Sequence, residues 1–235
     1  QGAADDGLPI LRAVLRPGAL PVMTGPHRQV VAAFDFDGTL TTGDTLLPFL
    51  ARGLGWPRVF LSLIKCAPWL AGYALRLVPN DVAKQRLLVD TLKGRSLLEM
   101  DAWTTRWLDE GFTGRLRTDA MARLDWHLEQ GHCCVMVSAS PDIYLQRVAR
   151  QLGFEGLLCT EMAVEGGRLT GLMSTPNCHG EQKVVRLKAW LAGRFGKDAA
   201  GLTVYAYGDT AGDFPMLRMA GPGLAWYKGK PWKEG

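Results

Sequence analysis

The sequence lacks the cysteine and histidine spacing that would indicate a zinc site or a disulfide-stapled fold. Its 235 residues contain five cysteines and four histidines, and these form neither a CxxC pair nor a Cys/His ligand pattern. An odd number of cysteines in a chain of this size is typical of reduced thiols. We therefore expect core thiols in a cytoplasmic protein.

A large excess of charge of one sign is also absent. Lys and Arg total 27 and Asp and Glu total 23, a net charge of +4, which is too small to indicate a nucleic-acid partner. Hydrophobic residues make up 47% and charged residues 21% of the chain. This composition excludes a disordered chain, a collagen-like fibre and a coiled coil, and the length fits one or two domains.

The beginning of the sequence has no signal-peptide pattern, because residues 1–20 contain no basic stretch followed by an apolar core. Residues 1–29 contain four glycines and four prolines, a density that disfavours regular structure. We expect this segment to be a poorly structured leader or tail, and we take Met23 as a hypothetical natural start.

The longest hydrophobic run, residues 59–78, approaches the length of a membrane span. Lys65 near its middle and Pro68 make a full span unfavourable. Two alternatives stay open: two shorter helices packed into a core, or a surface in peripheral contact with an anionic membrane. Eight basic and two acidic residues within 52–95, a net +6, and aromatic residues of interfacial type favour the second. These aromatic residues are Trp56, Trp69 and Tyr73.

Strands and helices alternate over most of the remaining chain, which predicts a mostly parallel α/β sheet. Expected strands cover residues 30–34, 133–137 and 203–207, a hairpin with a turn at 165–167 lies within 157–171, and expected helices cover 141–152 (capped by Ser140) and 181–195. Residues 46–125 contain no clear strand. The predicted architecture is a Rossmann-like core (30–45 and 126–235) flanked by helices, with an all-helical cap (46–125) inserted after the first strand.

The predicted strands lead into side chains that bind metal ions or phosphate. Asp35 and Asp37 follow the first strand, Ser138 the second, and Asp209 and Asp213 the last. In such sheets, ligands bind at the carboxyl ends of the strands. Carboxylates gathered there repel one another unless a cation neutralises them, and hard oxygen ligands suit Mg²⁺.

A phosphate ligand would suit the remaining polar groups near these strand ends. The start of the helix after Ser138 offers free N–H groups to a phosphate. Lys183 offers the fixed positive charge that phosphoryl transfer requires. A carboxylate beside a bound cation can act as the nucleophile.

Four segments together resemble the haloacid dehalogenase-like phosphatases. Asp35-Phe36-Asp37-Gly38-Thr39-Leu40-Thr41 matches their DxDGT(L/V)(T/V) signature, and Ser138, Lys183 and Gly208-Asp209-x3-Asp213 match the other motifs in order. Residues 170–183 and the helical insertion are similar to the phosphoserine phosphatase-like branch. The resemblance covers about residues 30–228.

This resemblance implies a role for each matched residue. Asp35 would attack phosphorus, and Asp37 would act as general acid and then general base. Asp35, the Asp37 backbone carbonyl and Asp209 would ligate Mg²⁺, with Asp213 supporting the metal site. Ser138 and Lys183 would hold phosphate oxygens, while Gly38 and Thr39 would shape the loop around the phosphate.

Two positions depart from the phosphoserine phosphatases. Gly212 stands where they carry Asn, and Asp44 stands where they carry a Glu that contacts the substrate amine. Asp44 is a possible substrate contact or simply a loop acid or helix cap. His179 is similarly a possible substrate contact or a loop histidine.

The resemblance implies a Mg²⁺-dependent phosphomonoesterase acting on a small phosphorylated metabolite such as phosphoserine or histidinol phosphate. The apolar, basic cap leaves open a lipid phosphate, such as phosphatidylglycerophosphate, at the inner face of the membrane. Two further alternatives are a catalytically silent module that binds a phosphorylated ligand and a phosphotransferase. The intact acidic motif disfavours the silent module. Phosphate release without an added acceptor would distinguish a hydrolase from a phosphotransferase.

Overall fold

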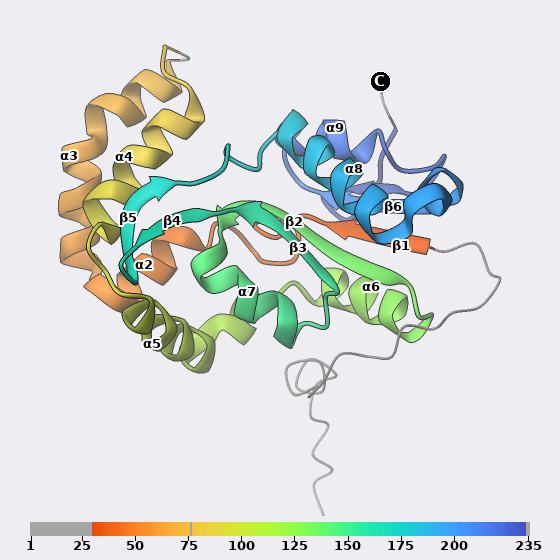
Figure 1. Ribbon diagram of the computed structural model, residues 1–235, viewed down its shortest axis with the longest axis horizontal. Helices are drawn as coiled ribbons and strands as arrows, with labels where there is room; N and C mark the ends of the chain where they lie inside the picture. The colour runs from red at the N-terminus through yellow and green to blue at the C-terminus, as the bar shows by residue number, and fades with distance from the viewer. Residues whose placement is uncertain (1–29, 76, 234–235) are drawn as a thin grey trace, which may run out of the picture.

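The computed structural model describes residues 30–75 and 77–233 (Figure 1). The leader expected over residues 1–29 and the hypothetical start at Met23 lie outside the described residues. At the centre of the described chain is a six-stranded sheet of order β3-β2-β1-β6-β7-β8. All neighbouring pairs are parallel except β7 with β8. The predicted α/β class is confirmed.

The sheet strands have the following bounds: β1 (Val30–Phe34), β2 (Cys133–Pro141), β3 (Gly156–Thr160), β6 (Thr203–Gly208), β7 (Ala225–Tyr227) and β8 (Lys230–Pro231). β1 is the predicted apolar run, and its last four residues are buried. Alternate side chains of a strand point to opposite faces. Ala32 and Phe34 therefore belong to one hydrophobic cluster, and Val31 and Ala33 to a second.

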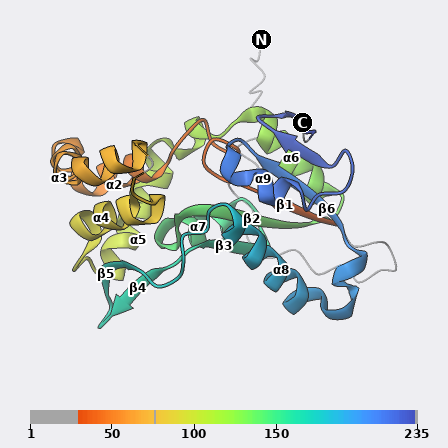
Figure 2. The same ribbon diagram turned by 90° about the horizontal axis from the view of Figure 1, so that it is seen from above.

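Helices cover both faces of the sheet (Figures 1 and 2). On one side lie α6 (Thr118–Glu129) and α7 (Asp142–Gln151), which contact β2. On the other lie α8 (Glu181–Phe195), η3 (Gly196–Gly201), η4 (Ala211–Asp213) and α9 (Phe214–Leu217). The predicted helix over residues 181–195 is confirmed. A sheet buried on both faces fits the continuous apolar sequence of its strands.

The remaining helices gather at one end of the sheet (Figure 2). They are α2 (Leu46–Leu54), α3 (Trp56–Ala74), α4 (Asn80–Leu92), α5 (Leu97–Trp107), η1 (Leu108–Phe112) and η2 (Thr113–Arg115). A two-stranded hairpin, β4 (Met162–Glu165) and β5 (Arg168–Met173), joins them by packing on α4. The boundary expected after residue 125 falls inside α6. We propose that the cap consists of α2–α5 and that α6 belongs with the sheet it covers.

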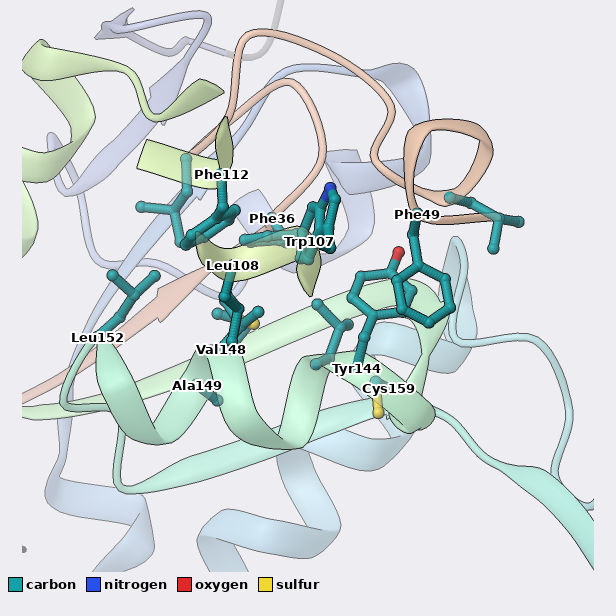
Figure 3. Packing of buried hydrophobic residues seen from close by; sticks show 14 of the residues in the cluster. Phe36, Phe49, Trp107, Leu108, Phe112, Tyr144, Val148, Ala149, Leu152 and Cys159 are labelled. Atoms are coloured by element: carbon teal, nitrogen blue, oxygen red, sulfur yellow. The ribbon is translucent and has the colours of Figure 1, made fainter. Parts of the chain in front are cut away.

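Aromatic side chains fix the cap helices to α7 (Figure 3). Phe49 of α2 stacks on Tyr144 of α7 with ring centroids 4.6 Å apart. Trp107 of α5 meets the same tyrosine edge-on at 5.3 Å. All three side chains are nearly or fully buried, so the cap and the sheet share one hydrophobic cluster.

Three local expectations differ from the structure. Ser140 does not cap α7, because the strand continues to Pro141 and the serine hydroxyl bonds elsewhere. Residues 157–160 pair with β2 in the main sheet, so the hairpin is confined to β4 and β5. Pro68 lies inside one continuous helix, α3. Proline leaves the carbonyl of Ile64 without its donor, and both residues face solvent, where water can satisfy that carbonyl.

Candidate active site

The loop after β1 places Asp35 at the centre of a buried polar cluster. Its Oδ1 atom lies 2.6 Å from Lys183 Nζ, and its Oδ2 atom lies 3.0 Å from Thr39 Oγ1. Thr39 Oγ1 is also 3.2 Å from Asp209 Oδ1. Because β1 lies next to β6 in the sheet, residues that are 170 positions apart meet at one strand edge.

Gly38 is required by this approach of two loops. Its φ angle of 80° is in the left-handed region, which favours glycine. A Cβ atom at this position would lie 2.2 Å from Asp209 Oδ2. Any larger residue would therefore push the Asp209 carboxylate away from Asp35.

Lys183 lies in the first turn of α8 and is 2% exposed. Its Nζ atom donates to Asp35 and to Asp213 Oδ1, each at 2.6 Å. Burial disfavours its charge, but Asp35 and Asp213 together raise the pKa of Lys183 above its ordinary value. The lysine is therefore a permanent cation between two carboxylates.

Asp213 holds the loop after β6 in shape. Its Oδ2 atom accepts hydrogen bonds from the backbone N–H groups of Asp209 and Thr210 at 3.2 and 2.9 Å. The Thr210 hydroxyl donates to the same oxygen at 2.9 Å. With its other oxygen on Lys183, Asp213 accepts hydrogen bonds from protein groups on both carboxylate oxygens.

Three carboxylates form a group that suits a divalent cation. One ligand atom from each of Asp35, Asp209 and Asp213 lies within 4.8 Å of the others. Burial raises the pKa of Asp209, and the nearby charge of Asp213 adds to that effect. Burial raises the pKa of Asp35 to about 7, against the opposing charge of Lys183. A hard cation such as Mg²⁺ fits this donor set and would relieve the repulsion.

The side chain of Asp37 is held apart from this group. Its Oδ1 atom accepts from the Thr45 backbone N–H at 2.8 Å and from the Thr45 hydroxyl at 2.6 Å. Its Oδ2 atom accepts from Ser140 Oγ at 2.5 Å. Burial, and then the charge of Asp44, raise its pKa to about 6. A carboxyl with this pKa can give and take a proton near neutral pH.

Sequence reasoning missed Thr45, Ser140 and Tyr144, which together orient Asp37. Tyr144 is fully buried, and its hydroxyl lies 3.0 Å from Thr45 Oγ1. A signal for Ser140 was present, because it is two residues after Ser138 in a strand and side chains two apart share a face. Thr45 and Tyr144 carried no such signal, since tertiary packing alone brings them together.

Ser138 lies in the last part of β2 and is fully buried. Its Oγ atom accepts a hydrogen bond from the Ser140 backbone N–H at 3.0 Å. β2 is the other neighbour of β1. Ser138 therefore comes from the strand beside the one that carries Asp35.

A lysine of the cap also enters the site, and sequence reasoning missed it as well. Lys84 Nζ donates to Asn177 Oδ1 at 2.9 Å and to the Ala139 carbonyl. Burial lowers the pKa of Lys84 to about 8. An amine on α4 thus contacts two segments of the core that flank Ser138 and Lys183.

The two possible substrate contacts are both exposed. Asp44 is exposed, and its Oδ1 atom accepts from the Leu47 backbone N–H at 3.2 Å, which is how a carboxylate stabilises the start of a helix such as α2. His179 lies against Gly212, where a Cβ atom would be 2.3 Å from His179 Nε2. The glycine at position 212 therefore makes room for the histidine ring.

The arrangement of these loops agrees with the comparison to known proteins. A family model described as haloacid dehalogenase-like hydrolase matches residues 32–218. The chain belongs to the haloacid dehalogenase-like hydrolase family. This hydrolase is 34% identical to Protein CicA of Caulobacter vibrioides over 213 residues, which cover 89% of this chain and 92% of that protein.

A second relative is Phosphoserine phosphatase SerB1 of Mycobacterium tuberculosis. It is 29% identical over 199 residues, covering 83% of this chain and 63% of SerB1. The resemblance to the phosphoserine phosphatase-like branch of the haloacid dehalogenase-like hydrolases is thereby confirmed. The chain is a phosphatase-type hydrolase.

Solved structures show the same fold. A protein of unknown function from Bordetella pertussis Tohama I matches with a TM-score of 0.72 at 26% identity, covering 84% of this chain and 93% of that one. A phospho-aspartyl intermediate analogue of phosphoserine phosphatase matches with a TM-score of 0.57 at 18% identity, covering 83% and 85% of the two chains. At that identity, the second match supports the fold alone.

Proposed function

We propose that this haloacid dehalogenase-like hydrolase cleaves phosphomonoesters through an aspartyl-phosphate on Asp35, with Mg²⁺ as cofactor. The observation that carries the proposal is the contact of Lys183 with Asp35 and Asp213, beside Asp209. A nucleophilic carboxylate, a fixed cation and the ligands for a divalent cation thus lie within one small volume. When bound, Mg²⁺ would neutralise negative charge on the transferring phosphoryl group.

In the first step, a carboxylate oxygen of Asp35 forms a bond to phosphorus as the bond to the ester oxygen breaks. Protonated Asp37 gives its proton to that leaving oxygen, so the product alcohol departs neutral. In the second step, Asp37 takes a proton from water as the water oxygen attacks phosphorus. The acyl–phosphate bond breaks, inorganic phosphate leaves and Asp35 is restored as a carboxylate.

The other site residues hold the reacting groups in place. Lys183 and Ser138 bind phosphate oxygens, and Asp209, Asp35 and the Asp37 carbonyl would hold Mg²⁺. Asp213 positions Lys183 and the loop that carries Asp209. Thr39, between the carboxylates of Asp35 and Asp209, fixes their separation.

We propose a small phosphorylated metabolite as the substrate. The phosphoserine phosphatase named among the relatives supports this class, and Lys84 supplies a cation for a second anionic group of such a substrate. Asp44 and His179 are the proposed contacts on the exposed side. The exposed apolar surface of α3 favours a lipid phosphate as the second candidate.

Phosphate release from p-nitrophenyl phosphate with Mg²⁺ and without an added acceptor tests the reaction. We expect turnover that EDTA abolishes and Mg²⁺ restores. Asp35→Asn should lower turnover to below a few per cent and keep the thermal melting curve. Retained activity in that variant would contradict the nucleophile assignment.

The chemical intermediate needs a test of its own. Acid quenching during turnover followed by peptide mass spectrometry should find phosphate on the peptide that holds Asp35. Release of p-nitrophenol only in the presence of an alcohol acceptor, with the phosphoryl group recovered on that alcohol, would instead indicate a phosphotransferase. Binding without turnover would indicate a silent module. A panel of phosphorylated metabolites and lipids then decides between the two substrate classes.

A further inference from the structure

The outer face of α3 is an apolar surface that no described part of the chain covers. The large side chains on it are Trp56, Phe60, Leu61, Ile64 and Leu75, which are 49%, 58%, 47%, 70% and 69% exposed. The other residues on this side of the helix are alanine and proline. We call these residues the α3 outer face.

The spacing of these residues places them on one side of a helix. Positions 57, 60, 61, 64, 68, 71 and the C-cap residue 75 follow the three- and four-residue intervals of one helical face, and Trp56 lies beside them at the start of the helix. All of them are exposed and uncharged. The opposite side, with Val59, Ser62 and Cys66, is buried. α3 therefore has two apolar sides, of which the fold uses only one.

α3 lies at the outer end of the cap in both ribbon views (Figures 1 and 2). Nineteen residues correspond to a helix about 28 Å long. A continuous exposed apolar surface of this length is uncommon on a protein that works alone in water and marks a site of interaction.

Basic residues border the α3 outer face. Lys65, at its edge, is half exposed and lies 3.3 Å from Asp90 Oδ1. Arg86 of the neighbouring helix α4 is exposed and stacks over Trp69. Residues 52–95 carry eight basic and two acidic residues, a net charge of +6, and α3 itself contains no acidic residue.

We propose that the α3 outer face docks on the surface of an anionic lipid bilayer. The apolar side chains would enter the boundary between headgroups and acyl chains, with α3 parallel to the membrane plane. The lysine and arginine side chains at the border would reach the anionic headgroups. Trp56, at the start of the helix, is of the residue type that prefers the membrane–water interface.

The charge argues against a second copy of this chain as the occupant. A symmetric dimer would place the same face of each subunit against the other. Two copies of α3, each with two basic residues and no acidic residue, would then lie side by side and repel. An anionic lipid surface would instead attract these basic residues. The apolar face and its basic border therefore favour a lipid bilayer over a second copy of the chain.

Docking on α3 would also bring the membrane close to the site. α4 packs directly against α3 and carries Lys84, which contacts Asn177 in the site. Docking on α3 would therefore leave only α4 between the membrane surface and Asn177 of the candidate site. The inference on membrane binding does not require the proposed function, since binding is measured without turnover.

Vesicle flotation of the full chain tests the inference. We expect it to float with vesicles that contain phosphatidylglycerol and to remain free with phosphatidylcholine alone. Binding should weaken as salt rises, because ions screen the headgroup charge. The variant F60Q/I64Q should lower partitioning at least tenfold.

The matched control is L98Q/V185Q, which replaces two residues that are 79% and 56% exposed outside α3. It should bind vesicles like the unmodified chain. Both double variants should retain turnover of p-nitrophenyl phosphate and the thermal melting curve, because all four positions are exposed. If turnover is absent in every form, the proposed function fails and the vesicle result still stands.

Three results would overturn the inference. The first is no flotation of the unmodified chain with anionic vesicles. The second is binding without specificity, seen either as equal loss in L98Q/V185Q and F60Q/I64Q or as equal binding to phosphatidylcholine. The third is a dimer in analytical ultracentrifugation that F60Q/I64Q dissociates, which would assign the α3 outer face to a second copy.

Discussion

At the scale of the residue, the candidate site depends on carboxylates whose two oxygens both accept hydrogen bonds. Asp37 accepts hydrogen bonds on both carboxylate oxygens, from Thr45 on one and from Ser140 on the other. A carboxyl fixed in this way keeps its orientation as it gains and loses a proton. Thr45 is the N-cap residue of α2, so the cap takes part in orienting the proposed acid.

Ser140→Ala should lower kcat about tenfold and leave KM nearly unchanged. The lost hydrogen bond to a charged group corresponds to about 1.5 kcal/mol or more, and it orients Asp37 without contacting the substrate. Steady-state kinetics with p-nitrophenyl phosphate measure the two constants. Ser140→Thr, which keeps a hydroxyl, is the control and should retain most of kcat; an equal loss in both variants would contradict the positioning role.

The pairing of His179 with Gly212 gives a second prediction at this scale. In Gly212→Ala, the new Cβ atom would lie 2.3 Å from His179 Nε2 and must displace the ring. We expect Gly212→Ala and His179→Ala to lower kcat/KM by similar factors. The double variant should have the same kcat/KM as either single variant, because both changes remove the His179 ring from its position against Gly212. Additive losses would show that the two residues act separately.

At the scale of the element, α4 connects the cap to the catalytic loops. It packs between α3 and the hairpin strand β5, and it brings Lys84 to Asn177 and Ala139. Gly171 of β5 has a φ angle of 81°, and a Cβ atom there would lie 2.7 Å from the Val89 Cα atom. This close contact fixes the position of α4 and hence of its lysine.

The titration of Lys84 should make kcat/KM decline at alkaline pH. Because burial lowers its pKa to about 8, the amine is charged below that pH and neutral above it. The attraction for an anionic substrate, and with it kcat/KM, should therefore fall as pH rises through about 8. In Lys84→Met, kcat/KM should be about tenfold lower at pH 7, and its alkaline decline should be absent. The same decline in this variant would exclude Lys84 as its source.

At the scale of the whole molecule, one hydrophobic cluster holds the cap on the sheet. Phe49, Trp107 and Tyr144 join α2, α5 and α7, and the same cluster continues to Phe34 in the central strand. No helix in the described part of the chain is long and apolar enough to cross a membrane. The exposure of Phe60, Leu61 and Ile64 places the apolar outer side of α3 at the surface of the cap.

Phe49→Ala should destabilise the molecule by about 3–5 kcal/mol, the usual cost of removing a buried aromatic side chain. The loss should appear in chemical unfolding as a lower midpoint, or as a separate early transition of the cap. Leu98→Ala, at a position that is 79% exposed, is the control and should change stability by less than about 0.5 kcal/mol. Equal stability of both variants would contradict the shared cluster.

The order of apolar and polar residues along the chain was enough to predict the central strands and the residues at their carboxyl ends. An apolar run such as Val30–Phe34 can only be buried between two layers, and the carboxyl ends of adjacent parallel strands must meet. The structure accordingly brings Asp35, Lys183, Asp209 and Asp213 together. The order of their motifs along the chain also carried the family resemblance.

The side chains that surround those residues could not be predicted in this way, because they come from elements that meet only in the folded chain. The bond from Ser140 to Asp37, the entry of Lys84 from the cap and the fit of His179 against Gly212 join segments that are far apart in sequence. Local periodicity predicts the face of an element but not its neighbour. The sequence of α3 likewise shows that the helix is hydrophobic. Whether its outer face is exposed depends on how the cap helices pack, which the sequence does not show.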